Sequence, residues 1–348
     1  MKNSTAKKVL GIVLAGTMIF GMTACSGSSK QEGTAETSGS SAGGTSEEST
    51  ATADLSGDGE YYMITFQSGI DYWTGCYEGF ERAGKASGAT TVYTGSTDGD
   101  FAKEVDVLEQ VIAKNPAGIA ITCVDPDALS ESINKAIEAD IPVVTFDSDS
   151  PNSERMAYLG TGNENAGAEA AAFMAEQIGH EGKVALVYFA GSQNQEERAA
   201  GFEKYMEENE PNIEVVQRAN GGETENEAAS ATASLIQGNP DIKGLFACNA
   251  WTGLGVGTAV QEAGKTGDIC VVAFDTDEGV LDYIESGVIQ GSVVQGTQQM
   301  GYWAFQFLAA ANHDYVIDGW DEKGLAAVPS TVDTGVSIVS ADNLDSFR

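Results

Sequence analysis

Polar side chains with two hydrogen-bonding atoms in one plane recur directly after apolar, strand-like runs of this chain. Asp147 follows VVTF, Asn249 follows LFAC, Asp275 follows VVAF and Gln295 follows SVV. A carboxylate or amide of this kind can meet two adjacent hydroxyls of a polyol at once. These residue types at these positions therefore favour recognition of a polyhydroxylated small molecule.

Aromatic and cationic side chains stand at comparable places. Tyr72 and Trp73 come shortly after the first strand-like run, and Arg198 falls in the first turns of the helix expected after residues 183–189. Aromatic rings suit the C–H faces of a sugar ring, and a guanidinium adds a planar donor. Each residue also has a structural alternative, because Asp or Asn after a strand often caps a helix and both aromatics could be core. The recurrence of such residues at equivalent strand ends favours a ligand-binding site.

The elements that position these residues are short β-rich runs alternating with helix-length segments. One such segment, 101–114, places Val105, Leu108, Val111 and Ile112 at helical spacing. Asp125 before Pro126 marks the start of another helix. We predict nine strands, at 61–67, 91–94, 118–123, 142–146, 183–189, 213–217, 244–248, 269–274 and 291–294.

This alternation predicts an α/β fold in which parallel sheets are covered by helices on both faces. Nine strands are many for one sheet, and the strand–helix–strand order before Asp147 repeats after Lys183. We therefore expect two similar doubly wound lobes, with ligand bound beyond the carboxyl ends of the strands.

The N-terminus has the layout of an export signal. Lys2, Lys7 and Lys8 precede an apolar run at 9–20, and small residues stand just before Cys25. The run is too short to be a confident membrane span. Small residues before a cysteine resemble the bacterial lipobox, which implies that residues 1–24 are a lipoprotein signal peptide and that Cys25 is lipidated; the alternative is an ordinary cleaved signal with an incidental cysteine.

Residues 25–59 are predicted to be a disordered tether behind that lipid anchor. The segment is mostly Ser, Thr, Gly, Ala and Glu, with no aromatic residue and a single Leu. It cannot bury enough apolar surface to offset the entropy of ordering it. About thirty flexible residues span roughly 30 Å, so the globular part would stand off the outer face of the cell membrane, within the cell envelope.

Composition excludes several classes of function. With 18 basic and 52 acidic residues, the net charge of −34 argues against a nucleic-acid partner. Neither histidine, His180 or His313, follows a predicted strand, and no GxSxG, HExxH or Walker motif is present. We expect no metal, no cofactor and no enzymatic activity, although Asp147 and Asp149 could in principle form a glycosidase pair. The remaining cysteines are expected to be buried free thiols, namely Cys76, Cys123, Cys248 and Cys270.

Six runs stand in the order and approximate spacing found in the ribose-type, type I periplasmic sugar-binding proteins: YWTGCYEGF, VVTFDSD, EERAAGF, LFACNA, VVAFDTD and SVVQ. The resemblance extends from Tyr61 to about Asn343. It implies the periplasmic binding protein type I fold, a three-segment hinge and a ligand site made by Tyr72, Trp73, Asp147, Arg198, Asn249, Asp275 and Gln295.

The same resemblance implies the domain boundaries. Residues 60–160 and 296–332 would form lobe 1, and residues 161–295 and 333–348 would form lobe 2. Two departures argue against ribose as the ligand, because Ile70 stands where the family has Asn and Ser148 stands where it has Arg. We place Asp149 in the cleft with Asp147 and Asp275.

The expected function is that of a lipid-anchored, extracytoplasmic receptor, acting as a monomer. It would capture a small sugar or polyol and present it to the permease of an ABC importer. The alternative is a sensor of an autoinducer-like furanose or a nucleoside, with a sensor kinase as its partner.

Overall fold

The computed structural model describes residues 59–97, 101–313 and 328–348. The predicted signal, Cys25 and nearly all of the predicted tether lie outside the described residues. Within the described residues, no helix combines the length and the apolar character needed to cross a bilayer.

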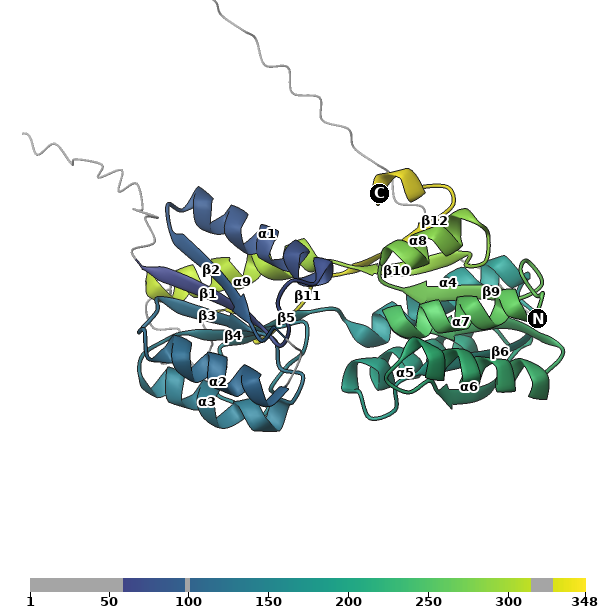
Figure 1. Ribbon diagram of the computed structural model, residues 1–348, viewed down its shortest axis with the longest axis horizontal. Coiled ribbons are helices and arrows are strands. Elements are labelled where there is room, and N and C mark those ends of the chain that lie inside the picture. Colours follow the sequence, from purple (N-terminus) through teal and green to yellow (C-terminus); the bar gives the residue numbers. More distant parts are fainter. Residues whose placement is uncertain (1–58, 98–100, 314–327) are drawn as a thin grey trace, which may run out of the picture. The chain divides into compact units, whose positions relative to one another are not determined.

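The first sheet contains six parallel strands in the order β11-β5-β4-β3-β1-β2 (Figure 1). Helices α1 and α9 pack on one face of this sheet, and α2 and α3 pack on the other. The bounds are β1 (Glu60–Thr65), β2 (Thr90–Gly95), β3 (Gly118–Ile121), β4 (Val143–Phe146), β5 (Ala157–Gly160), β11 (Thr331–Asp333), α1 (Asp71–Ala86), α2 (Phe101–Ile112), α3 (Pro126–Glu138) and α9 (Thr297–Asn312).

The second sheet repeats this plan, in the order β12-β10-β9-β8-β6-β7, with β12 antiparallel to β10. Helices α4 and α5 cover one face, and α6, α7 and α8 cover the other. The bounds are β6 (Gly182–Tyr188), β7 (Ile213–Asn220), β8 (Ile242–Ala247), β9 (Cys270–Phe274), β10 (Gly291–Gln295), β12 (Val336–Ser340), α4 (Asn163–Ile178), α5 (Gln193–Asn209), α6 (Glu225–Gly238), α7 (Ala250–Glu262) and α8 (Glu278–Glu285).

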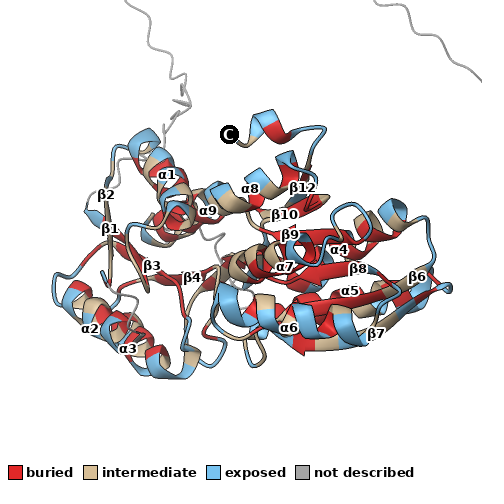
Figure 2. Ribbon diagram, turned by 45° about the vertical axis from the view of Figure 1, so that its right-hand side comes forward, coloured by how far each residue is buried: buried red, intermediate tan, exposed pale blue. Residues whose placement is uncertain are grey.

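The strands are apolar along their whole length because both faces of each sheet are covered. In β1, Tyr61 and Met63 pack beneath α1 and α9, whereas Tyr62 and Ile64 pack against α2 and α3. This is the two-residue alternation of a pleated strand. Figure 2 shows the strands of both sheets mostly buried and the outer surfaces of the helices exposed.

The α/β class and the two doubly wound sheets are confirmed. Each of the nine predicted strands matches an observed one, with ends shifted by up to three residues. The sequence prediction lacked β5, β11 and β12. The helix start at Asp125 is confirmed, since its carboxylate accepts from the Ala128 N–H at 3.1 Å. The four cysteines of the described residues are buried and unpaired, as predicted.

The chain passes between the two sheets at three places. The first crossing, Thr161–Gly162, joins β5 to α4; the second, Gly296, joins β10 to α9; the third, Thr334–Gly335, joins β11 to β12. One carboxylate oxygen of Asp333 accepts from the N–H groups of Gly162 and Gly335, both at 2.8 Å. The first and third crossings are therefore fastened to each other.

Glu104 on α2 is a fully buried acid of the first sheet. One carboxyl oxygen accepts from the Thr122 hydroxyl at 2.9 Å, and the other has no partner. Burial raises the pKa of Glu104 to about 8, the Thr122 bond opposes the rise, and the charge of Asp125 adds to it. From pH ~4.5 to ~8 the folded chain thus keeps a proton that the unfolded chain releases, so this group lowers the free energy of unfolding as pH rises.

Glu104→Gln is expected to raise the free energy of unfolding at pH 8 and to leave it nearly unchanged near pH 4.5. The amide keeps the acceptor for Thr122 and carries no proton to lose. Urea unfolding from pH 4.5 to 8.5 measures the difference from the parent. Glu109→Gln, on the same helix, is the matched control. Hydrogen bonds from Ser132 and Lys135 lower the pKa of Glu109, which is the opposite direction to the shift at Glu104. A difference between Glu104→Gln and the parent that is constant across pH would contradict the assignment.

Candidate functional site

Asp147 and Asp275 occupy equivalent positions at the carboxyl ends of β4 and β9. Both have left-handed backbone conformations, with φ of 61° and 66°. Aspartate tolerates this region better than most residues. The N–H of Asp147 donates to the Leu159 carbonyl at 3.1 Å, and that of Asp275 donates to the Val293 carbonyl at 2.8 Å. The backbone thus leaves the two sheets in the same way at these aspartates.

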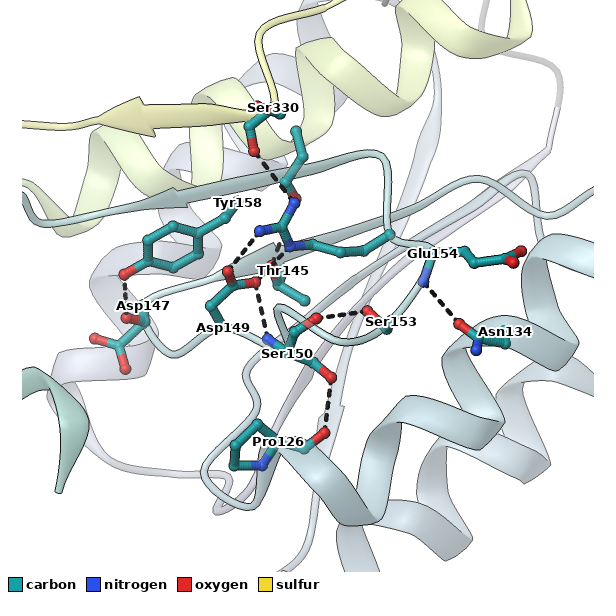
Figure 3. A network of polar contacts seen from close by, with 12 residues as sticks. Pro126, Asn134, Thr145, Asp147, Asp149, Ser150, Ser153, Glu154, Tyr158 and Ser330 are labelled. Carbon is teal, nitrogen blue, oxygen red and sulfur yellow. Dashed lines mark hydrogen bonds and ion pairs between the residues drawn. The ribbon is translucent and has the colours of Figure 1, made fainter. Parts of the chain in front are cut away.

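A hydroxyl from the neighbouring strand fixes each of these turns. The Tyr158 hydroxyl donates to the Asp147 carbonyl at 2.7 Å (Figure 3). The Ser292 hydroxyl donates to the Asp275 carbonyl at 2.6 Å. The two aspartates therefore have equivalent, hydrogen-bonded backbone positions at the ends of the two sheets.

At the end of the first sheet, Asp147 accepts from two hydroxyls. Tyr72 donates to one carboxylate oxygen at 2.6 Å, and Ser148 donates to the other at 2.9 Å. Burial raises the pKa of Asp147, opposed by these two bonds and by the charge of Arg198. Burial and the charges of Asp147 and Asp275 raise the pKa of Tyr72, which keeps its hydroxyl a donor.

Trp73 lies deeper than Tyr72. Its side chain is 5% exposed and meets the rings of Tyr72 and Phe146 edge-on, with centroids 4.7 and 6.1 Å apart. Tyr72 is only partly buried. Of the two predicted stacking aromatics, Tyr72 is therefore the more accessible, and Trp73 packs against it from the core.

At the end of the second sheet, the guanidinium of Arg198 is hydrogen-bonded to three partners. Its guanidinium donates to the side chain of Asn163 at 2.9 Å, to the carbonyl of Cys248 at 2.9 Å and to the amide oxygen of Gln295 at 3.1 Å. The group also lies over the ring of Phe274, 3.7 Å from its centroid. Arg198 is 4% exposed. A guanidinium has five N–H donors, so two remain for a further acceptor.

Gln295 links Arg198 to Asp275. Its amide nitrogen donates to Asp275 at 2.8 Å, while its amide oxygen accepts from Arg198. Burial raises the pKa of Asp275 to about 6, opposed by Arg198 and by the bond from Gln295. At neutral pH this carboxylate is charged and can accept hydroxyl protons, and it gains a proton near pH 6.

Asn249 is both a helix cap and an incompletely bonded group. Its side-chain oxygen accepts from the Thr252 N–H at 2.9 Å, which starts α7 as the structural alternative predicted. Its side-chain nitrogen has no partner, although the residue is 5% exposed. A buried donor left unpaired costs about 1–3 kcal/mol, and native structures contain few of them. A ligand oxygen would supply the missing acceptor.

Asp149 does not belong to this group, which corrects our placing it in the cleft. Arg155 donates to both of its carboxylate oxygens at 2.5 Å, and Thr145 donates to one of them at 2.6 Å. In Figure 3 the Asp147 carboxylate points away from that of Asp149. The two carboxylates therefore point apart (Figure 3).

The structure thus brings the predicted residues into two hydrogen-bonded groups. Tyr72 and Asp147 form one, and Arg198, Gln295 and Asp275 form the other. Sequence reasoning missed Asn163 and Tyr158, which lie after and on β5. The signal that could have found them is the short apolar run YLG, which ends directly before Thr161.

Other candidates lie away from these strand ends. His180 follows α4 and lies 3.0 Å from Glu210, and His313 ends α9. In the described residues, no cluster of His, Cys, Asp and Glu is arranged to hold a metal ion. A surface hollow of about 500 Å³ over α1 and α9, lined by Glu78, Arg82, Tyr302 and neighbouring residues, contains none of the predicted site residues.

Comparisons with known proteins agree with the fold described above. Residues 61–313 match the family model described as periplasmic binding protein domain. The ribose import binding protein of Bacillus subtilis is 26% identical over 258 residues, which covers 74% of this chain and 81% of that protein.

Two solved structures are more similar. The sugar-binding protein of a sugar ABC transporter from Bacillus halodurans is 41% identical, with a TM-score of 0.79, and covers 83% of this chain and 100% of its own. AraP, an arabinose binding protein from Geobacillus stearothermophilus, is 40% identical, with a TM-score of 0.80, and covers 83% of this chain and 99% of its own. The chain therefore belongs to the periplasmic binding protein domain family, as its sequence motifs predicted.

Proposed function

We propose that this chain captures a small sugar or polyol and delivers it to an ABC importer. The observation that carries the proposal is the pair of equivalent strand-end aspartates, Asp147 and Asp275, one joined to Tyr72 and the other to Arg198 through Gln295. Planar acceptors and donors of this kind match adjacent hydroxyls. The names of the similar proteins support sugar as the ligand class and an importer as the destination.

The binding step is proposed to be a hinge closure. Lobe 1 would comprise residues 60–160 and 296–332, and lobe 2 residues 161–295 and 333–348. A ligand that contacts residues of both lobes favours the closed state by its extra affinity for that state. Trp73 would act from beneath Tyr72, and Asn249 would donate its unpartnered N–H to a ligand oxygen.

The family is one of binding proteins, and we propose no catalytic role and a monomeric state. The importer function is also preferred to the sensor alternative, because the similar proteins named above include an import binding protein and an ABC transporter component. The ion pair between Asp149 and Arg155 supports the proposal of no catalytic role, because it holds Asp149 away from a glycosidase pair with Asp147.

Ser148 narrows the choice of sugar. Ser148 stands where the ribose-type pattern has arginine. It offers only a hydroxyl, which donates to Asp147. Arg198 is therefore the cation whose charge acts on Asp147, and the site lacks the further arginine of the ribose-type pattern, which disfavours anionic sugars. The 40% identity to an arabinose binding protein makes arabinose the first ligand to test.

Isothermal titration calorimetry with arabinose and a panel of other pentoses, hexoses, deoxysugars and inositols tests the proposal. We expect at least one ligand with a Kd that is micromolar or tighter. If protein that is shown to be folded binds no sugar of the panel, the proposal of a sugar receptor is rejected.

The lipid anchor is a proposal that rests on residues 1–25. Cys25→Ser removes the sulfur that would carry the diacylglyceryl group, so the protein should move from the membrane fraction to the soluble fraction with unchanged sugar affinity. Ser26→Ala is the matched control and should stay with the membrane. Fractionation followed by immunoblotting measures both, and membrane retention of Cys25→Ser would refute the anchor.

A further inference from the structure

Thr161 connects the first crossing to the second. It is the first residue after β5, it is 4% exposed, and its hydroxyl donates to the amide oxygen of Gln295 at 2.7 Å. Gln295 is the last residue of β10 and directly precedes the second crossing, Gly296. The bond therefore joins the first crossing to the residue that directly precedes the second.

The same amide is the link inside the proposed binding group. Its oxygen also accepts from Arg198 at 3.1 Å, and its nitrogen donates to Asp275 at 2.8 Å. Thr161 and Arg198 both donate to the amide oxygen, so the amide nitrogen is the end that faces Asp275. Without the Thr161 hydroxyl, Arg198 would be the one donor left on the amide oxygen, and the bond to Asp275 would hold the nitrogen.

Residues next to Thr161 strengthen its position. Asn163 accepts from the Arg198 guanidinium at 2.9 Å, so this stretch contacts both Arg198 and Gln295. The N–H of Gly162, between them, donates to Asp333 at 2.8 Å, and Asp333 also holds Gly335 of the third crossing. The first crossing is thus fixed on one side by the hinge and on the other by the binding residues.

We propose that Thr161 is a positioning residue for ligand binding, which orients the Gln295 amide toward Asp275 and couples the first crossing to the site. The inference rests on the proposed binding function and deepens it. Thr161 does not need to touch the ligand, because it acts through Gln295.

The consequence can be measured at Asp275 itself. Gln295 and Arg198 stabilise its charged form, while burial and the carboxylates of Asp277 and Asp147 oppose it. Tyr72 is a further titratable group that interacts with Asp275. A loosened Gln295 amide removes one stabilising bond, so the pKa of Asp275 should rise further.

The test compares Thr161→Val, which is isosteric and lacks the hydroxyl, with Thr161→Ser, which retains it. Thr232→Val is the matched control, since Thr232 is fully buried and donates only to the Ala228 carbonyl of its own helix, at 2.7 Å. Carbon-13 NMR of the carboxyl groups, assigned with Asp275→Asn, follows the titration of Asp275 in ligand-free protein. Calorimetry at pH 5 to 8 then gives the affinity for the panel sugar that the parent binds most tightly.

Thr161→Val should raise the pKa of Asp275 and weaken sugar binding about three- to ten-fold, the range of one neutral hydrogen bond. Thr161→Ser and Thr232→Val should match the parent. Weaker binding with an unchanged Asp275 titration would overturn the inference, as would parent-like behaviour of Thr161→Val in either measurement. If the parent binds no sugar, the proposed function fails, and the NMR titration alone still decides whether Thr161 positions the Gln295–Asp275 pair.

Discussion

Replacing Arg198 by alanine is expected to weaken sugar binding by about thirty-fold to a thousand-fold, or about 2 to 4 kcal/mol. Arg198 is buried, lies over Phe274 and has two N–H donors beyond those already bonded. Its removal deprives the ligand of a cationic donor. It also leaves the acidic groups Asp147 and Asp275 without the charge that lowers the pKa of each.

Arg198→Lys separates charge from geometry. Lysine keeps the charge, but it lacks the planar fork that reaches Asn163, Cys248 and Gln295 together, so we expect an intermediate loss. Arg218→Ala is the control, because Arg218 pairs with Glu203 on the outside of α5. Calorimetry gives the affinities, and thermal unfolding checks the fold. Parent-like binding by folded Arg198→Ala would show that the assigned site is wrong while the fold assignment stands.

Gly167→Ala is expected to reduce both stability and affinity. A Cβ at Gly167 would lie 1.9 Å from the carbonyl oxygen of Arg198 and 2.8 Å from the backbone nitrogen of Phe202. Backbone atoms cannot rotate away as a side chain can, so α4 and α5 must separate. Overpacking of this kind costs about 1–3 kcal/mol, and here we expect the upper end. The shift of α5 also moves Arg198, which should weaken sugar binding.

Two other glycine variants serve as controls for Gly167→Ala. Gly301→Ala places a Cβ 1.7 Å from the Cys76 carbonyl between α9 and α1, so it should destabilise the first sheet without touching the backbone of Arg198. Gly238→Ala, at the end of α6, meets nothing within 4 Å and should leave the protein as stable or about 0.5–1 kcal/mol more stable. Urea unfolding and calorimetry measure all three. Gly167→Ala with the stability of Gly238→Ala would contradict the close packing of α4 on α5.

The sheets were predictable because most of their strands are buried on both faces and therefore apolar throughout. The prediction failed where that signal is weak. Strand β11 has three residues, two of them exposed, and β5 has four, so neither is long enough to show a pattern. Strand β12 alternates exposure and lies at the sheet edge. These short elements are the ones that lead into and out of the crossings.

The candidate site was predictable as a set of positions, because carboxyl ends of parallel strands gather at one edge of a sheet. The directions of the side chains were not predictable. Asp147 and Asp149 are two residues apart, yet the left-handed turn at Asp147 and the ion pair of Asp149 with Arg155 send their carboxylates apart. Contacts such as Thr161 with Gln295 join residues 134 positions apart in the chain, which local spacing does not encode.

A crystal structure of the protein with its tightest-binding sugar tests the central claim most directly. We predict sugar oxygens about 3 Å from Arg198 and Asp275 on one side and from Asp147 on the other, with the unpartnered nitrogen of Asn249 bonded to the sugar. A sugar bound elsewhere, for example in the hollow over α1 and α9, with Arg198 and Asn249 making no contact with it, would contradict the account.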